Sequence, residues 1–318
     1  MPLSPFPVTG KICASDGSTG FPDVEVILRN TSRDLESSAN TESDGSFSFD
    51  LANNGGYVSG DSLRIDARIG NFWVYTTGTV SGDGWNAGNL ALSSTDDLPR
   101  IYFPLIKEEL IVFIRNKIND PNNRLSTKID VFKGDGHTLR FNLSVTNGKS
   151  VEYVLVDGII KTRYTDYYVD YKDKNVLSNP VVYFLTPPLN DSVIEVKYRY
   201  GDTDWVYGDY PFITTTVDDY PRIKMDISSL TTNEFAFGGG ANYSNGVVEA
   251  IVWDDKASVV DDLVDKIRRK IIDSKKDFHF LDFITPSEIG RLTPTPERGD
   301  KIIQRESTYL VRSKVEVI

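Results

Sequence analysis

The feature that most constrains the fold of this chain is a helix separated, along the sequence, from the strands that would complete its domain. Ile106, Leu110, Ile114 and Ile118 recur every four residues and predict an amphipathic helix over 106–118. Roughly 90 residues of strand-like sequence follow before the next helical pattern. A compact pattern of strand, strand, helix, strand and strand then fills the rest of the sequence. We therefore expect a small α+β domain interrupted by an inserted β module.

The second predicted helix lies at 258–273. Its apolar stripe consists of Val259, Leu263, Ile267 and Ile271. Ser258 precedes Asp261 at the spacing of a capping box, in which two side chains hydrogen-bond the free N–H groups of the first turn. The helix also carries a basic cluster: Lys266, Arg268, Arg269, Lys270, Lys275 and Lys276. This cluster could bind nucleic acid, but we expect it on the outer face, because the apolar stripe must pack on a sheet.

Strands are expected around this helix at 223–227, 247–253, 277–284 and 301–318. Two long loops, 228–246 and 284–300, are rich in Gly, Ser, Thr and Pro. Loops of this length are uncommon in compact domains unless they have a function, and a binding partner can repay the entropy lost on ordering them. We therefore predict contacts with other subunits or proteins at eight residues of these loops: Phe235, Phe237, Gly238, Gly239, Gly240, Tyr243, Ile289 and Arg291.

Residues 1–97 are predicted to form a β-sandwich that decorates the rest of the molecule. Short alternating stretches, such as 24–28, 47–51 and 63–67, are separated by turn clusters such as 53–56. This regular spacing of short strands and turns is typical of a sandwich.

Three segments of this region, Val8–Ile12, Gly20–Val26 and Thr41–Phe49, also carry a family resemblance. They resemble the carboxypeptidase-regulatory-like sandwiches, whose pattern is G-x-I, then G-x-P-x-V-x-V, then T-D-x-x-G-x-F-x-F. The resemblance implies a structural addition and no reaction.

Residues 127–205 are predicted to form the inserted β module. Gly134-Asp135-Gly136 precedes a strand, and Val151–Val156, Tyr167–Tyr171 and Ile194–Tyr200 follow it as further strands. The order resembles a small β module that recurs in phage structural proteins. The tyrosines at 164, 167, 168 and 171 could stack sugars or bases, but packing within the sheet is the better interpretation.

Charge and cysteine content exclude several classes. The net charge is −11, and residues 1–100 hold 13 acidic against six basic residues, whereas 247–318 are nearly neutral. A broad nucleic-acid footprint would need a basic face. Cys13 is the only cysteine, so no disulfide can form within the chain. We find no signal peptide and no apolar run of the length of about 18 residues that a membrane span needs. We therefore expect synthesis in a host cytoplasm and no membrane association.

The sequence contains no convincing catalytic, cofactor or metal-binding set, and we predict that the chain is not an enzyme. His137 and His279 have no partner at metal-ligand spacing, and His279 is read as an ordinary strand histidine. Cys13 is expected to be buried and inert. The paired acids 254–255 and 261–262 flank a helix start, where acids are expected.

The C-terminal pattern carries the resemblance with the most specific functional implication. Tyr220-Pro221-Arg222-Ile223, Val248–Trp253, Ile267-Arg268 and Arg305–Val311 follow the helix at 106–118 in the order of the tail terminator (tail completion) proteins of long-tailed phages and related archaeal viruses. The resemblance implies an α+β domain formed by 101–126 and 206–318. It also implies a ring, usually hexameric, that caps the tail tube below the head–tail connector.

The sequence thus predicts a mainly β chain with an α+β core, and a virion neck component through which genome DNA passes without specific binding. The expected partners are copies of the same chain and other neck or tail proteins. Two alternatives stay open. One is another virion part, such as a baseplate, tail-tube or fibre-attachment protein. The other is a surface carbohydrate-binding β-sandwich protein, which the tyrosines would favour.

Overall fold

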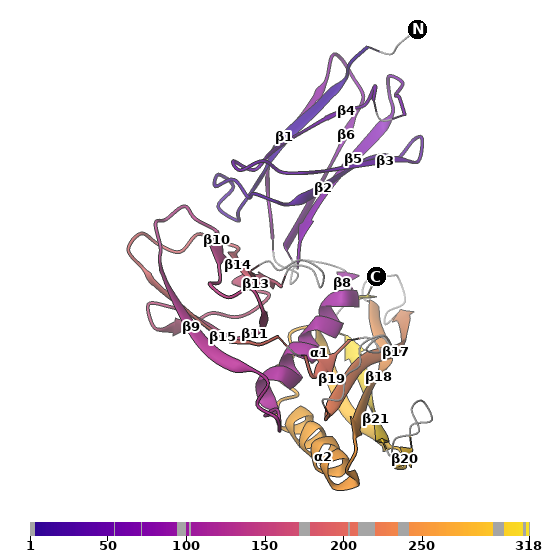
Figure 1. Cartoon of the computed structure of the whole chain (residues 1–318). Coiled ribbons are helices and arrows are strands. Elements are labelled where there is room, and N and C mark those ends of the chain that lie inside the picture. Colours follow the sequence, from indigo (N-terminus) through magenta and orange to yellow (C-terminus); the bar gives the residue numbers. More distant parts are fainter. Residues whose placement is uncertain are drawn as a thin grey trace.

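The chain is mainly β, with two helices among its described residues, and Figure 1 shows its sheets gathered in three groups. The computed structural model describes residues 4–53, 55–70, 72–93, 100–101, 103–171, 179–202, 204–208, 220–234, 242–294, 302–313 and 316–317. The fold class predicted from the sequence, mainly β with an α+β C-terminal part, is confirmed.

The N-terminal residues form a sandwich of two sheets, with strand orders β4-β1-β7 and β3-β2-β5-β6. Val26 and Leu28 of one sheet and Phe47 and Phe49 of the other are buried, because alternate residues of a strand face the same side. The strands are β1 (Pro7–Cys13), β2 (Glu25–Asn30), β3 (Leu35–Asn40), β4 (Ser46–Asp50), β5 (Ser62–Ile69), β6 (Phe72–Thr79) and β7 (Trp85–Ala91).

The inserted module is also built from two sheets, with orders β12-β11-β15-β9 and β10-β14-β13. Ile194, Val196 and Tyr198 of its central strand β15 are fully buried on the side that faces the second sheet. The strands are β9 (Ser126–Lys133), β10 (Arg140–Asn142), β11 (Gly148–Val156), β12 (Ile159–Ile160), β13 (Tyr167–Asp170), β14 (Val181–Phe184) and β15 (Val193–Tyr200).

The sandwich and the inserted module share one hydrophobic core. The rings of Phe21 and Tyr183 stack across the junction with centroids 5.9 Å apart, and the backbone N–H of Ser15 donates to the carbonyl of Leu185 at 3.2 Å. The sandwich is therefore packed against the module as well as joined to the chain through residues 94–99.

The C-terminal part is a sheet with both helices on one face, and it is antiparallel except where β16 pairs with β17 in parallel. Its order is β16-β17-β18-β21-β19, and β20 pairs with β21 beside this path. Ile106 and Ile114 of α1 share a core with Leu263 and Ile267 of α2 and with the sheet. The elements are α1 (Phe103–Lys117), β16 (Val206–Tyr207), β17 (Arg222–Glu234), β18 (Asn242–Asp254), α2 (Ala257–Asp273), β19 (Leu281–Ile289), β20 (Thr293–Pro294) and β21 (Ile303–Ser313).

Short strands next to this sheet were not predicted. β8 (Arg100–Ile101) pairs in parallel with β22 (Glu316–Val317), which brings the start of the C-terminal part beside its end. The final predicted strand, 301–318, is accordingly two strands, β21 and β22.

The prediction of a loop over 228–246 is wrong. Residues 229–234 pair with 242–247, so β17 and β18 form one long hairpin whose tip, 235–241, lies outside the described residues. Thr231 and Thr232 favour this outcome, because β-branched residues suit a pleated strand. The loop predicted at 284–300 is likewise shorter, because β19 continues to Ile289.

Two local predictions around α2 are also wrong. The helix begins at Ala257, and Lys256 at its N-cap position makes no side-chain cap. Asp254 accepts the N–H of Lys256 at 2.8 Å instead, while Asp261 pairs with Arg305 across to β21, so no capping box forms. The strand expected from 277 starts only at Leu281, because the preceding residues turn to dock against α1.

Candidate functional site

The structure describes three of the eight predicted contact residues, and it does not bring all of them together. Phe235, Phe237 and the glycines 238–240 lie outside the described residues. Tyr243 lies on β18 opposite Asn233, close to the hairpin tip. Ile289 ends β19, with 41% of its surface exposed, and the exposed Arg291 follows just beyond it.

Tyr243 and Ile289 are far apart along the sheet. Ile289 lies opposite Ser307, which in turn lies opposite Ala250, seven residues further along β18 than Tyr243. A strand rises about 3.3 Å per residue, so roughly 23 Å separate the two positions along the strand. If both loops make contacts, they contact different neighbours or distant parts of one neighbour.

A better defined candidate surface is the face of the C-terminal sheet opposite the helices. The register of β17, β18 and β21 places Asp226, Glu249 and Glu306 on this face, and Glu288 of β19 joins them. Burial raises the pKa of Glu306, and the neighbouring carboxylates of Glu249 and Glu288 raise it further. The face is therefore acidic at its centre.

Three basic residues of the same face, Arg222, Lys224 and Arg312, reduce this negative charge. The side chain of Lys224 is only 9% exposed, and its ammonium lies 2.9 Å from Asp226. A second lysine, Lys107 of α1, reaches the same carboxylate at 3.1 Å, so hydrogen bonds to the two ammonium groups favour the charged form of Asp226 and its pKa falls below the ordinary value despite burial. The surface is thus mixed in charge.

One end of the same face is apolar. Ile251, Trp253 and Ile302 form a small buried cluster, against which Tyr220 packs. The indole N–H of Trp253 donates to Gln304 at 2.8 Å. The guanidinium of Arg222 lies 5.6 Å from the centre of the Tyr220 ring, a favourable cation–π distance. These contacts hold the aromatic side chains of this end in place.

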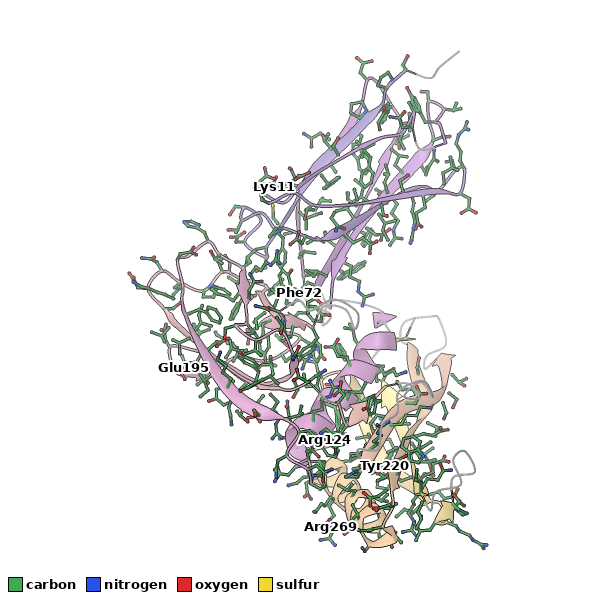
Figure 2. The ribbon with its side chains drawn as sticks, in the orientation of Figure 1. Lys11, Phe72, Arg124, Glu195, Tyr220 and Arg269 are labelled. Carbon is green, nitrogen blue, oxygen red and sulfur yellow. The ribbon has the colours of Figure 1, made fainter. Side chains whose placement is uncertain are left out.

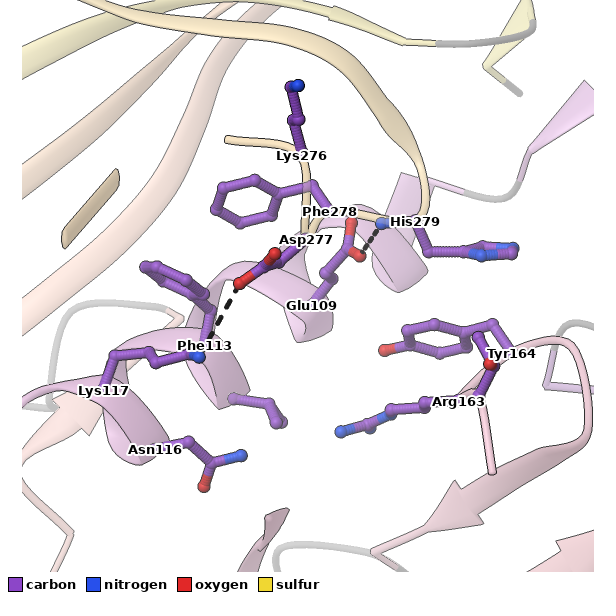
Figure 3. Close-up of a pocket in the computed structure, with 12 residues that line it drawn as sticks. Glu109, Phe113, Asn116, Lys117, Arg163, Tyr164, Lys276, Asp277, Phe278 and His279 are labelled. Atoms are coloured by element: carbon purple, nitrogen blue, oxygen red, sulfur yellow. Dashed lines mark hydrogen bonds and ion pairs between the residues drawn. The ribbon is translucent and has the colours of Figure 1, made fainter. Parts of the chain in front are cut away.

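Figure 3 shows a cavity of about 340 Å³ where α1 meets the inserted module and the turn before β19. Glu109 accepts the backbone N–H groups of His279 and Phe280, the latter at 3.2 Å. Lys117 and Asp277 form an ion pair of 3.7 Å at the rim. These contacts hold the turn onto α1.

The other wall of this cavity holds the inserted module in place. Arg163 pairs with Glu108 of α1, and its guanidinium lies 4.8 Å from the centre of the Tyr164 ring. Burial raises the pKa of Glu108, although Arg163 opposes this shift. The ring of Tyr164 also packs on Phe280, 4.6 Å away. The chemistry of this region is that of a structural junction.

The cysteine, tyrosines and histidine singled out in the sequence have largely structural roles in the fold. Cys13 is buried in β1, and burial raises the pKa of its thiol, as expected for an inert cysteine. Tyr167 of β13 is 3% exposed and packs within its sheet as predicted, whereas Tyr164, 2% exposed, lies before β13 and packs on Phe280. His279 packs between Tyr164 and Phe280, in a turn and not in the predicted strand.

Sequence reasoning missed the acidic face and the junction around Glu108 and Arg163. The sequence does indicate the charged face, because the charged residues at 222, 224 and 226 alternate with Ile223 and Met225. No comparable signal marks the junction, since Glu108 and Arg163 are 55 residues apart and meet only in the folded chain.

Within the described part of the chain no group of three His, Cys, Asp or Glu side chains is placed to hold a metal ion. Nor is any described helix long and apolar enough to cross a membrane.

Comparison with known proteins identifies no family. No family model matches the sequence, and no curated protein matches it. Among solved structures, one from Bacteroides vulgatus described as "Putative pore-forming toxin" aligns over 100% of this chain and 94% of its own, with 9% identity and a TM-score of 0.18. Two chains with so low a TM-score need not share a fold, so this likeness supports no functional argument.

Proposed function

We propose that this chain is a structural protein of a tailed virus, a ring-forming neck component similar to the tail terminators. The observation that carries the proposal is the order α1-β17-β18-α2-β19-β21, folded as an antiparallel sheet with both helices on one face. This is the element order that the sequence resemblance implies for the terminator domain. The inserted module and the sandwich extend from it (Figure 1).

The helix-free face of the sheet supports the proposal through its charge. DNA must pass along the axis of a neck ring without being held, and a wall rich in Lys and Arg would bind its phosphates. Asp226, Glu249, Glu288 and Glu306 lie on this face together with Arg222, Lys224 and Arg312, so the face is mixed in charge and not rich in bases. The basic residues of α2 lie elsewhere: Lys266, Arg268 and Arg269 are exposed on the outer side of the helix, while Leu263 and Ile267 are buried beneath it.

The β17–β18 hairpin supports the proposal through its length. Each strand has 13 residues, whereas a typical strand has about five or six. A long hairpin can reach a neighbouring subunit, and a closed ring repeats one such contact by rotation. We favour six subunits, as in the rings that the resemblance implies, with other neck and tail proteins above and below.

The proposal is tested by the mass of the purified protein and by its place in particles. Light scattering at micromolar concentration and negative-stain images should show a ring, and gold labelling should mark the head–tail joint. Replacing 236–242 by a seven-residue Gly-Ser linker should lower the mass without changing the circular dichroism spectrum. The matched control replaces 172–178, seven residues of the inserted module, with the same linker and should leave the ring intact.

Two results would reject the proposal. One is a monomer at all accessible concentrations together with absence of the protein from particles. The other is a ring whose mass is the same after both replacements and whose label lies away from the head–tail joint.

A further inference from the structure

Exposed large hydrophobic side chains are concentrated in the inserted module. Of the twelve that stand exposed in the described part of the chain, half belong to this module. They are Ile129, Val131, Ile159, Ile160, Leu189 and Val193. Single exposed hydrophobics are ordinary, but a group of them on one face marks an interaction surface.

The strand register places several of these side chains on one face of the sheet β12-β11-β15-β9. Val131 lies opposite Glu195, which lies opposite Leu155, and Leu155 lies opposite Ile160. Paired residues of antiparallel strands point to the same side. These four residues therefore form one row across the sheet, with a carboxylate at its second position.

A second row lies two residues away along each strand. It consists of Ile129, Lys197 and Tyr153. The ammonium of Lys197 lies 2.6 Å from Glu152 and 5.7 Å from the centre of the Tyr153 ring, so it is held on this face. The two rows thus have the same pattern, aliphatic, charged and apolar, but their charges are opposite.

This face points away from the rest of the molecule. The alternate residues Ile194, Val196 and Tyr198 point inward and are fully buried, whereas Val131 and Ile129 are 64% and 48% exposed. Figure 2 places the labelled Glu195 on the outer margin of the module, away from the sandwich and the C-terminal sheet.

We propose that this face binds the same face of a second copy of the chain about a twofold axis that runs across the strands between the two rows. Such an axis brings each row opposite the other row of the second copy. Glu195 then faces Lys197 of the second copy, Val131 faces Ile129, and Leu155 faces Tyr153. Each of these three facing pairs is complementary in charge or in apolar character, and the contact is isologous, as in most homodimers.

The geometry favours face-to-face stacking and not the addition of a strand to the sheet edge. β9 is the end strand of its sheet, and Asp130 at its centre points inward, where it accepts hydrogen bonds from Ser144 and Tyr198. Inward-pointing charges on an end strand discourage pairing with another edge. Two stacked sheets about 10 Å apart need no free edge.

This contact is independent of the proposed ring, because it uses the inserted module alone. A twofold contact cannot relate neighbours within one closed ring, which share a rotational contact. It would therefore join free subunits or two whole rings before they meet other virion proteins.

The experiment measures mass by sedimentation across about 1–100 µM, a range chosen to bracket common dimer affinities, for the full chain and for E195K and K197E. Each single variant places like charges opposite one another and should weaken the contact at least about a hundredfold. A mixture of the two variants should restore it, because the lysine introduced by E195K then faces the glutamate introduced by K197E. If the chain forms rings, each variant should halve the mass of the assembly, because two stacked rings separate. If the chain forms no rings, each variant should convert the dimer to a monomer.

The matched control is Glu25→Lys, the same charge change at an exposed strand position of the sandwich, which should leave the mass unchanged. Circular dichroism and hydrogen exchange of β9 show whether each variant is folded. The proposal is overturned if the unaltered chain shows no twofold assembly at the highest concentration. It is also overturned if E195K assembles like the unaltered chain, or if folded E195K and K197E fail to associate when mixed.

Discussion

At the scale of single residues, the sandwich depends on a backbone turn that only glycine fits. Gly45 has φ of +85°, and a Cβ at this position would lie 2.4 Å from the carbonyl oxygen of Ile12 and 2.7 Å from the backbone nitrogen of Phe21. The backbone N–H of Ile12 donates to the carbonyl of Gly45 at 2.9 Å. The glycine of the sequence pattern therefore lies where three chain segments meet.

The first prediction compares two glycines of the sandwich. Gly45→Ala should lower the free energy of unfolding by more than about 2 kcal/mol, because backbone atoms cannot yield to the new methyl group. Gly82→Ala is the control, since Gly82 has φ of +66° but no atom within 4 Å of a Cβ; it should cost only about 1 kcal/mol for the left-handed backbone. Urea denaturation followed by tryptophan fluorescence measures both. Equal losses in the two variants would contradict the argument from close approach.

The second prediction concerns Asp130. Burial alone would raise the pKa of its carboxyl group, but hydrogen bonds from Ser144 and Tyr198 hold that pKa below the ordinary value. Asp130→Ala removes the acceptor of three donors and should cost about 2–3 kcal/mol of unfolding free energy, whereas Asp130→Asn should cost less.

The same carboxyl group predicts a pH dependence. The folded-state pKa is the lower one, so the contribution of Asp130 to stability is complete above pH ~4, the ordinary range for Asp, and is lost as the pH falls below it. The melting temperature of Asp130→Ala should therefore approach that of the unaltered chain as the pH is lowered from 7 toward 3. A constant difference across this range would show that the carboxylate does not act through its charge.

At the scale of elements, the sequence predicts apolar stripes well and element ends poorly. Leu263, Ile267 and Ile271 of the α2 stripe are buried as expected and Val259 is partly buried, because periodicity largely determines which residues face a core. The start of α2 was misplaced, because Ser258 and Asp261 fit a local capping pattern, whereas in the fold Arg305 of β21 pairs with the carboxylate of Asp261 and Asp254 accepts the N–H of Lys256. The β17–β18 hairpin was read as a loop for a similar reason, since its polar residues are ordered by pairing across the hairpin.

The candidate surfaces, too, could be predicted from the sequence only in part. The exposed basic face of α2 could be predicted, because it is the complement of an apolar stripe. The acidic face needs the register of β17, β18 and β21 before Asp226, Glu249 and Glu306 can be placed together. The two rows around Glu195 likewise need the pairing of β15 with both its neighbours.

The third prediction tests the observed helix start against the capping pattern. Ser258→Ala should change the free energy of unfolding by less than about 0.5 kcal/mol, because Ser258 lies inside α2 and is exposed. Asp254→Ala should cost about 1 kcal/mol or more, since it removes the acceptor for the N–H of Lys256. Chemical denaturation of the two variants distinguishes the cases, and a larger loss for Ser258→Ala would restore the capping box.

At the scale of the whole molecule, charge separates a DNA conduit from a DNA-binding protein. The net charge of −11 disfavours binding to phosphates, and the helix-free face is mixed in charge and not basic. The exposed bases of α2 are partly neutralised within the helix, since Lys266 pairs with Asp262 and Arg269 with Asp265 at 2.6 Å each.

The fourth prediction is that the isolated protein binds duplex DNA no more tightly than about micromolar near physiological salt, the range of non-specific contact. Fluorescence anisotropy with a labelled duplex measures the affinity. A variant with Lys266, Arg268 and Arg269 changed to Ser serves as the comparison and should bind no more weakly than the unaltered chain. Tighter binding that disappears in this variant would assign α2 a nucleic-acid role.

The insertion between α1 and β16 also sets the order in which the chain can fold during synthesis. α1 leaves the ribosome about 100 residues before β17, and at about 5–20 residues per second that interval lasts roughly 5–20 s. The sandwich is already complete by then, and the inserted module is finished during the interval, so its turn at Arg163 can receive Glu108 before any strand of the C-terminal sheet exists. The inserted module can therefore cover part of α1 in the later part of the interval, before the C-terminal sheet is made.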